Sequence, residues 1–213
     1  RNIITYDNEL HNKSLEIVKE EKYLGVVINQ KLSWKPHIVK MTSKANNSRH
    51  FLQRNLVNCN KEVKLQCYKT YVRPILEYSS TVRDPVNNKG LNEKIEGAQN
   101  KSIRWICNKW DINSSPTSMA KELKLQSLHS RRQIAKLKLL HSFNHELKFL
   151  PNNIRPALAR CTDTRFKVIY GRINIYADSF FPSTISKWNK LPPNIVNTTS
   201  PEAFATLLEK LIS

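Results

Sequence analysis

Glycine is scarce in this chain of 213 residues, which contains only four glycines, at positions 25, 90, 97 and 171. They lie too far apart to form a GxGxxG turn, a GxxxxGK[ST] phosphate-binding loop or a GxSxG nucleophile elbow, so these motifs are excluded. Long apolar runs are also missing, and none approaches the roughly 20 residues of a membrane-spanning helix. We therefore expect no membrane partner. The chain starts at Arg1 without a methionine or a signal peptide, which indicates a fragment of a longer protein.

Cysteine is rare, and its spacing excludes the common zinc sites. Cys59, Cys67, Cys107 and Cys161 form no CxxC pair and no Cys–His pattern of zinc-ligand spacing. Cys67 and Cys107 lie among apolar helical positions, which favours buried free thiols. We expect a reduced, metal-free, intracellular protein, located in the nucleus and the cytoplasm.

Acidic residues are few and scattered, which bears on catalysis. Two-metal phosphoryl transfer needs clustered carboxylates, and no two of the five aspartates are adjacent. We place the pair Glu20–Glu21 in a solvated turn. His141 and His145 have the i,i+4 spacing of a helical metal pair but lack the HExxH glutamate and a third ligand, so we expect them at a helix surface or boundary. The fragment alone is therefore expected to have no catalytic residues, no metal site and no cofactor.

Basic residues are abundant and concentrated in the middle of the chain. The 35 Lys and Arg exceed the 17 Asp and Glu, giving a formal net charge of +18. Residues 1–33 are balanced (5 − 5 = 0), residues 34–147 carry 21 − 8 = +13 and residues 148–213 carry 9 − 4 = +5. A positive field of this kind attracts polyanions. We favour nucleic acid over an acidic lipid surface or a role in solubility, because the basic residues recur on helices that have apolar faces.

The hydrophobic pattern predicts an α+β, mainly α fold. β-prone segments at 3–6, 15–18 and 23–28 indicate strands, with a tight turn near Glu20–Glu21. Apolar stripes with helical spacing then follow from Ser33 onwards. The predicted domains are a hairpin segment at 1–33, a basic helical domain at 34–147 and a small mixed C-terminal extension at 148–213.

Five of the helices can be placed by their stripes, caps and prolines. Pro74 should kink or break a helix that begins at the Asn60 cap, and Ser115–Pro116 should open a short helix. Segments 166–170 and 173–176 resemble two short strands or extended segments around Gly171. The expected apolar stripes are Ile38, Met41, Ala45, Ser48 and Leu52; Leu65, Tyr68, Val72, Ile75 and Ser79; Leu91, Ile95, Ala98, Ser102 and Ile106; Ile134, Leu137 and Leu140; and Phe204, Leu207, Leu208 and Leu211.

Several short motifs follow one another along the chain: Tyr23–Ile28 with Leu32–Trp34 and His37–Ile38, then Tyr71–Tyr78, Ile95–Gln99, Leu128–Arg132 and Trp188–Pro192. In this order they resemble the reverse transcriptase of non-LTR retrotransposons of the jockey-like LINE type. The resemblance covers essentially the whole chain.

The resemblance implies a part of the polymerase that grips nucleic acid. Lys22, Tyr23, Leu24 and Gly25 would form the primer-grip hairpin, and residues 34–147 the thumb that holds the template–primer duplex. The implied partners are an RNA template, a DNA primer, and the missing palm and fingers of the same polyprotein. The family's catalytic [FY]xDD motif would lie upstream of Arg1, so Mg²⁺ is expected only with the missing palm and polymerisation by this fragment alone is not expected.

The candidate binding residues are cations suited to phosphate contacts, which hold a duplex without reading its sequence. Besides the four hairpin residues, they are Lys40, Lys44, Arg49, Arg54, Lys69, Arg73, Arg131, Arg132 and Lys136.

Arg83 departs from the family's pattern, because the family commonly has Trp before the Asp–Pro of this segment. A buried charge there would cost several kcal/mol unless it reaches water or an acid. Either Arg83 reaches solvent, or the chain is a decaying copy of the element.

Two other functions are open. A domesticated adaptor that reads a defined nucleic-acid site would show a sequence preference. A helical protein-interaction scaffold would expose an apolar interface and associate when alone.

Overall fold

The computed structural model describes residues 9–111, 113–145, 154 and 165–212. As predicted, the fold is mainly helical, with two short antiparallel hairpins near the N-terminus. The strands are β1 (Glu9–Leu10), β2 (Lys13–Ser14), β3 (Glu20–Tyr23) and β4 (Val26–Asn29). The helices are α1 (Lys35–Asn55), α2 (Lys61–Cys67), the π-helix η1 (Tyr68–Val72), α3 (Arg73–Glu77), α4 (Lys89–Cys107), α5 (Pro116–Glu122), α6 (Leu128–Asn144), α7 (Asn174–Ala177), α8 (Phe180–Trp188), α9 (Pro193–Val196) and α10 (Pro201–Ile212). The predicted strand at 3–6 and Cys161 lie outside the described residues.

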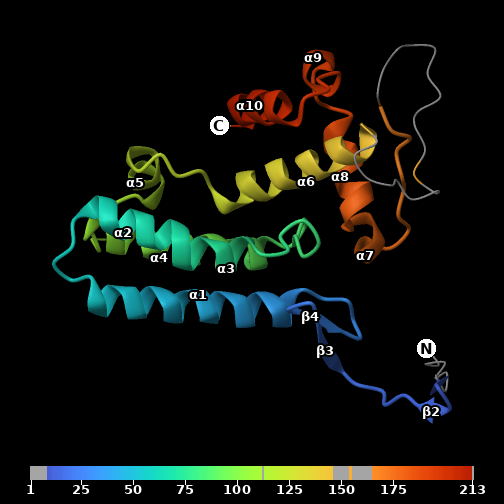
Figure 1. Ribbon diagram of the computed structural model, residues 1–213, viewed down its shortest axis with the longest axis horizontal. Helices are drawn as coiled ribbons and strands as arrows, with labels where there is room; N and C mark the ends of the chain where they lie inside the picture. The colour runs from blue at the N-terminus through green and yellow to red at the C-terminus, as the bar shows by residue number, and fades with distance from the viewer. Residues whose placement is uncertain (1–8, 112, 146–153, 155–164, 213) are drawn as a thin grey trace.

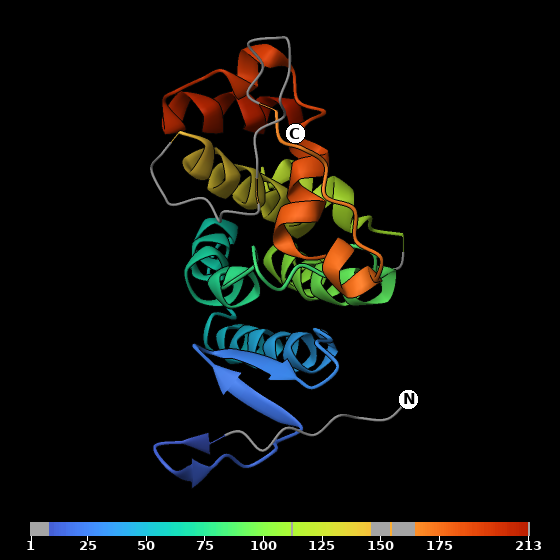
Figure 2. The same ribbon diagram turned by 90° about the vertical axis from the view of Figure 1, so that its right-hand side faces the viewer.

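The elements lie in successive layers from the hairpins to the C-terminus. In Figure 2 the hairpins are at one end, followed by α1, then by α2, α3 and α4, and then by α6 with α8. Helices α9 and α10 form the far end of the molecule, and Figure 1 shows the same order from the side. The N-terminal hairpins and the C-terminal helices are thus separated by the central helices.

The hairpin β3–β4 has its turn at Leu24–Gly25, so the predicted turn at Glu20–Glu21 is wrong. Glu20 and Glu21 belong to β3 and pair with Asn29 and Ile28 of β4. Leu24 (φ 45°) and Gly25 (φ 83°) both have left-handed backbones, as a two-residue type I′ turn requires. Gly25 supplies this conformation without strain, which explains why the chain reverses there rather than at the two glutamates.

Helix α1 packs the hairpin onto the central helices. Its predicted stripe is largely confirmed, because Ile38, Met41, Ala45 and Leu52 are buried. Ser48 is only half-buried, and Arg49 beside it is buried instead.

The helix from Asn60 is distorted before Pro74 rather than broken by it. The Asn60 side chain caps its start by accepting a hydrogen bond from the Val63 N–H (2.9 Å). Pro74 has no N–H to donate and its ring crowds the preceding turn, and the chain widens there into η1, where the Arg73 N–H reaches the Tyr68 carbonyl. The extra residue in this turn moves the buried face by one position, so Leu76 is fully buried where Ile75 was predicted.

Two hydrophobic cores lie along the chain. The first is built by α1 to α5 and includes Tyr68, Val72 and Ile103. The second joins α6 to the C-terminal helices, with Trp188 and Phe204 at a ring-centroid distance of 5.7 Å. The change of core falls at the start of α6, inside the predicted 34–147 segment; the division into three domains stays a prediction.

The C-terminal region differs from the prediction at 173–176, which is the helix α7 rather than a strand. A Cβ on Gly171 would come within 2.7 Å of the Ala177 backbone nitrogen, so the chain can fold back here only at a glycine. The segment at 166–170 is irregular apart from a single β-bridge at Phe166, whose backbone exchanges two hydrogen bonds with the Asn189 side chain (3.1 and 2.8 Å). In α10, Phe204 and Leu208 are buried as predicted, whereas Leu211 is exposed.

Candidate nucleic-acid interface

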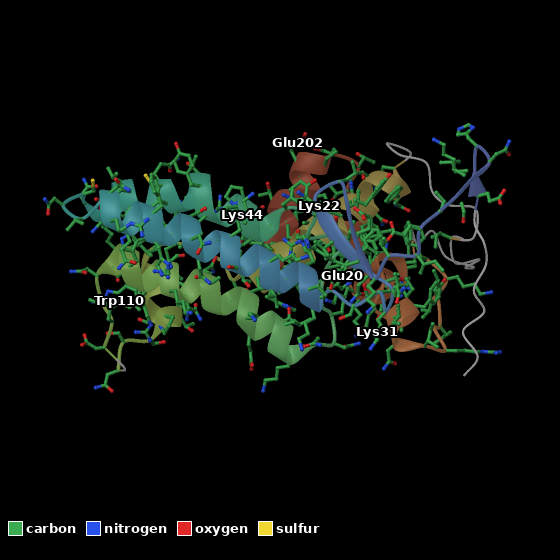
Figure 3. The ribbon with its side chains drawn as sticks, turned by 90° about the horizontal axis from the view of Figure 1, so that it is seen from below. Glu20, Lys22, Lys31, Lys44, Trp110 and Glu202 are labelled. Carbon is green, nitrogen blue, oxygen red and sulfur yellow. The ribbon has the colours of Figure 1, made fainter. Side chains whose placement is uncertain are left out.

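A pocket of about 720 Å³ lies between the hairpin β3–β4, α1 and α3. Four of the predicted binding residues line it: Lys22, Gly25, Lys40 and Lys44. They come from the hairpin and from α1, and in Figure 3 Lys22 and Lys44 extend from these two elements on the same side. The rest of the lining is mixed: it includes the carboxylates of Glu20 and Glu21 as well as apolar side chains such as Met41 and Ile75. We call this space the hairpin pocket.

Tyr78 holds the hairpin against α3. Its hydroxyl donates to the Leu24 carbonyl (2.7 Å), and its ring lies so close to Gly25 that an added Cβ would be 3.2 Å from Cε1. Leu24 and Tyr23 themselves are 74% and 66% exposed. The turn is therefore anchored from behind while its outer side chains face solvent, where they are accessible to a ligand.

His37 joins the hairpin to α1 at the wall of the same pocket. Its Nδ1 accepts the Val27 backbone N–H (3.1 Å), which assigns the proton of the neutral ring to Nε2. Burial, with the positive charges of Arg83 and Lys40, lowers the pKa of His37 to about 4. The ring is therefore neutral at physiological pH and acts as a structural acceptor.

The lysines of the hairpin pocket are only weakly neutralised. Lys40 forms an exposed ion pair with Glu20 (3.3 Å), which is worth about 1 kcal/mol or less. Among the described residues, neither Lys22 nor Lys44 has an acidic partner within ion-pair distance. Both cations remain available to an anion.

Arg49 and Arg54 occupy the later turns of α1. Arg54 is exposed in the last turn, whereas Arg49 is 5% exposed and, among the described residues, its hydrogen-bond partners are the side chains of Gln53 and His50. The positive charge of Arg49 lowers the pKa of the neighbouring His50, and the charges of Arg54 and of Lys101 on α4 lower it further. Sequence reasoning missed His50 and Lys101, because Lys101 is brought to α1 only by the packing of α4.

Arg132 and Lys136 are not available to nucleic acid, and the prediction that they contact phosphate is wrong. Each is 1% exposed. Asp84, in the loop before α4, accepts from Arg132 Nε (3.1 Å) and Lys136 Nζ (3.2 Å), and Lys136 also donates to Ser183 of α8 (2.8 Å). These cations join the two cores instead. This burial could not be predicted from local sequence, because both residues belong to a basic helix and their acidic partner lies far away in the chain.

The other predicted cations of the central helices are partly engaged. Arg131 donates to both carboxylate oxygens of Glu77, and Arg73 Nε lies 3.7 Å from the same side chain. Lys69 is half-buried on η1. One carboxylate thus neutralises part of the charge of two arginines, which weakens both as phosphate ligands.

Arg83 neither reaches solvent nor relies on a direct carboxylate contact. It is fully buried, and it donates from Nε to the Tyr78 carbonyl (2.6 Å) and from Nη2 to the Leu76 carbonyl (2.7 Å). These oxygens end α3, where carbonyls lack helical partners and carry partial negative charge. Burial, with repulsion from Arg132, lowers the pKa of Arg83 to about 10, so the guanidinium stays charged at neutral pH.

The described residues contain no group of three or more His, Cys, Asp or Glu placed to hold a metal ion. His141 is buried rather than at the surface, because its ring stacks on Phe204 at 4.2 Å.

Cys59, Cys67 and Cys107 are free and half-buried. In the described part of the chain, the helices are too short or too polar to cross a bilayer.

Comparisons of the chain with protein-family models, with curated proteins and with solved structures gave no match.

Proposed function

We propose that the chain is the template–primer-binding portion of a retrotransposon reverse transcriptase and grips the phosphate backbone without reading sequence. The observation that carries the proposal is the hairpin pocket. Lys22 and Gly25 belong to the segment that resembles the primer-grip hairpin. They line the same space as Lys40 and Lys44 of helix α1, which would be part of the thumb. Exposed Tyr23 and Leu24 flank this space at the turn. Lysines beside an apolar wall suit the phosphates and sugars of a nucleic-acid strand.

In this proposal the partners are an RNA template, a DNA primer and the upstream palm that carries the catalytic aspartates. The catalytic chemistry, with its Mg²⁺, belongs to that palm. The sites of action are the nucleus and the cytoplasm, where the element's RNA and its DNA target occur.

The test is binding of a labelled RNA–DNA hybrid across a salt series, compared with hybrids of scrambled sequence. Several phosphate contacts should give a slope of log K against log[salt] of about −4 to −8, with little difference among sequences. Lys40→Gln with Lys44→Gln should make the slope shallower by about 2. Lys190→Gln with Lys210→Gln removes two exposed lysines from the C-terminal region and is the matched control.

A flat salt dependence, or no binding, would exclude the proposal. A strong preference for one sequence would instead favour the domesticated adaptor.

The protein-interaction scaffold is a second candidate, and one observation favours it. Large apolar side chains are exposed along the hairpin region: Leu15, Ile17, Val18, Tyr23, Leu24, Ile28 and Leu32. Such a patch is typical of a docking surface. Concentration-dependent association in sedimentation, unaffected by the hybrid, would support the scaffold.

A further inference from the structure

Arg49 is a buried cation without an acidic partner among the described residues. It is 5% exposed, donates from Nη1 to Gln53 Oε1 (3.0 Å), and its Nη2 lies 2.6 Å from His50 Nε2. Its Nε has no hydrogen-bond partner among the described residues. Buried arginines are normally paired with a carboxylate, because an uncompensated charge in the interior is costly. The local structure therefore lacks an anion.

The surroundings of Arg49 add positive charge rather than neutralise it. Arg54 lies further along α1, and Lys101 extends from α4, which packs beside α1 along its length (Figure 3). The charged groups that act on His50 are Arg49, Arg54 and Lys101, all of them cations. Arg54 and Lys101 are exposed, so an anion can approach from solvent.

We propose that Arg49, His50, Arg54 and Lys101 form a binding site for one phosphate group, which we call the phosphate seat. If the bound group is a backbone phosphate of the template–primer, the phosphate seat rests on the proposed function. If the bound group is free inorganic phosphate, the phosphate seat is independent of that function. Three cations from two packed helices can surround a phosphate, and a guanidinium can donate two parallel hydrogen bonds to its oxygens.

His50 couples this site to pH. Near Arg49 Nη2, its Nε2 can act as an acceptor only when the ring is neutral. When His50 is protonated, Nε2 becomes a donor, so that both Arg49 and His50 can donate to a phosphate oxygen. Without a ligand the protonated ring is disfavoured, because Arg49 and Arg54 on α1 and Lys101 on α4 lower the pKa of His50. A bound anion offsets these charges and raises the pKa of His50. Anion binding should therefore take up a proton and become tighter as the pH falls.

The experiment is an NMR titration of the His50 ring in the full chain, free, with the RNA–DNA hybrid, and with inorganic phosphate at constant ionic strength. His50→Gln assigns the resonance by its loss, and its side-chain oxygen can still accept from Arg49. We expect either ligand to raise the pKa of His50 by about 1 unit. We also expect hybrid affinity to rise as the pH falls from 8 to 5.5, by no more than the roughly tenfold that a shift of about 1 unit allows, with that rise missing in His50→Gln.

Lys101→Gln tests the α4 side of the seat. Its loss should weaken hybrid binding about fivefold and reduce the pKa rise of His50, while Lys190→Gln should leave both unchanged. If the hybrid binds but the pKa of His50 does not move, the seat is excluded and the proposed function stands. If inorganic phosphate raises the pKa while the hybrid does not bind, the seat holds for free phosphate and the nucleic-acid function fails. If neither ligand moves the pKa and the hybrid does not bind, both are excluded.

Discussion

Arg83 is a buried charge whose hydrogen bonds are to backbone carbonyls, while its Nη1 has no partner among the described residues and the charge of Asp84 lies nearby. Its two hydrogen bonds are to the carbonyls of Leu76 and Tyr78, and Tyr78 in turn holds the hairpin turn through Leu24. Arg83 thus links the end of α3 to the residue that anchors the hairpin turn.

Arg83→Met should lower the free energy of unfolding by about 2–3 kcal/mol, because two carbonyls would lose their donor in a buried site. Urea denaturation at pH 7 measures the loss. Arg104→Met is the matched control: Arg104 also donates to a carbonyl, that of Asp111 (2.9 Å), but at the exposed surface, and it should cost less than about 0.5 kcal/mol. Equal losses in the two variants would contradict the role given to Arg83.

His37 should make stability depend on acid pH. Its folded-state pKa of about 4 lies below the ordinary 6.5, so the unfolded chain binds the proton more readily. The stabilisation is therefore complete above about pH 6.5 and is lost as the pH falls towards 4, by up to about 3 kcal/mol. In His37→Asn, whose amide oxygen can still accept from Val27, the difference in urea midpoint between pH 7 and pH 4.5 should shrink. An unchanged difference would exclude His37 as its source.

At the scale of the elements, η1 decides which side chain enters the core after Pro74. Leu76→Ala should cost about 3 kcal/mol, because Leu76 is fully buried. Ile75→Ala should cost less than half as much, since Ile75 is only partly buried. Comparing the two unfolding free energies at pH 7 tests this order of burial, and equal costs would contradict it.

The helices themselves were predictable because local spacing determines them. The buried positions Ile95, Ala98 and Ile106 of α4, and the cap at Asn60, follow from periodicity and short-range hydrogen bonding. The one-residue shift at η1 did not, because a proline indicates a disturbance without indicating whether the helix breaks or widens. Likewise, an acidic pair resembled a turn until the backbone of Leu24 and Gly25 located the reversal.

The candidate site was predictable only where its parts are close in sequence. Lys22, Gly25, Lys40 and Lys44 lie within one short stretch, and the structure brings them to one pocket. Whether Lys136 faces solvent depends instead on Asp84, far away in the chain, and no local pattern contains that information. The place of Lys101 in the phosphate seat was likewise not predictable, because the packing of α4 against α1 brings it there.

At the scale of the whole molecule, Asp84 connects the two hydrophobic cores. It belongs to the loop before α4, it binds Arg132 and Lys136 of α6, and Lys136 reaches α8 through Ser183. The buried cations Arg83, Arg132 and Lys136 outnumber this carboxylate. Loss of its charge would leave them without compensation.

Asp84→Asn should therefore cost about 3–5 kcal/mol and speed amide hydrogen exchange in both α4 and α8. Asp111→Asn, at an exposed aspartate, is the control and should change stability by less than about 0.5 kcal/mol. Faster exchange confined to one of the two helices would show that Asp84 does not connect the cores.

The strand β3 carries a further consequence for how the protein meets other chains. In the described part of the structure, β3 pairs with β4 alone, so its second edge is not covered by another strand, although the Lys22 N–H donates to Glu21 Oε1 (2.9 Å). Edges of this kind recruit foreign strands and seed aggregates unless they are protected. Here Glu20, Glu21 and Lys22 place three consecutive charges on the strand. An uncharged strand that paired with β3 would have to desolvate these three charges at a cost. The edge should therefore disfavour uncharged strands and accept only a strand whose charges are opposite in sign to those of Glu20, Glu21 and Lys22.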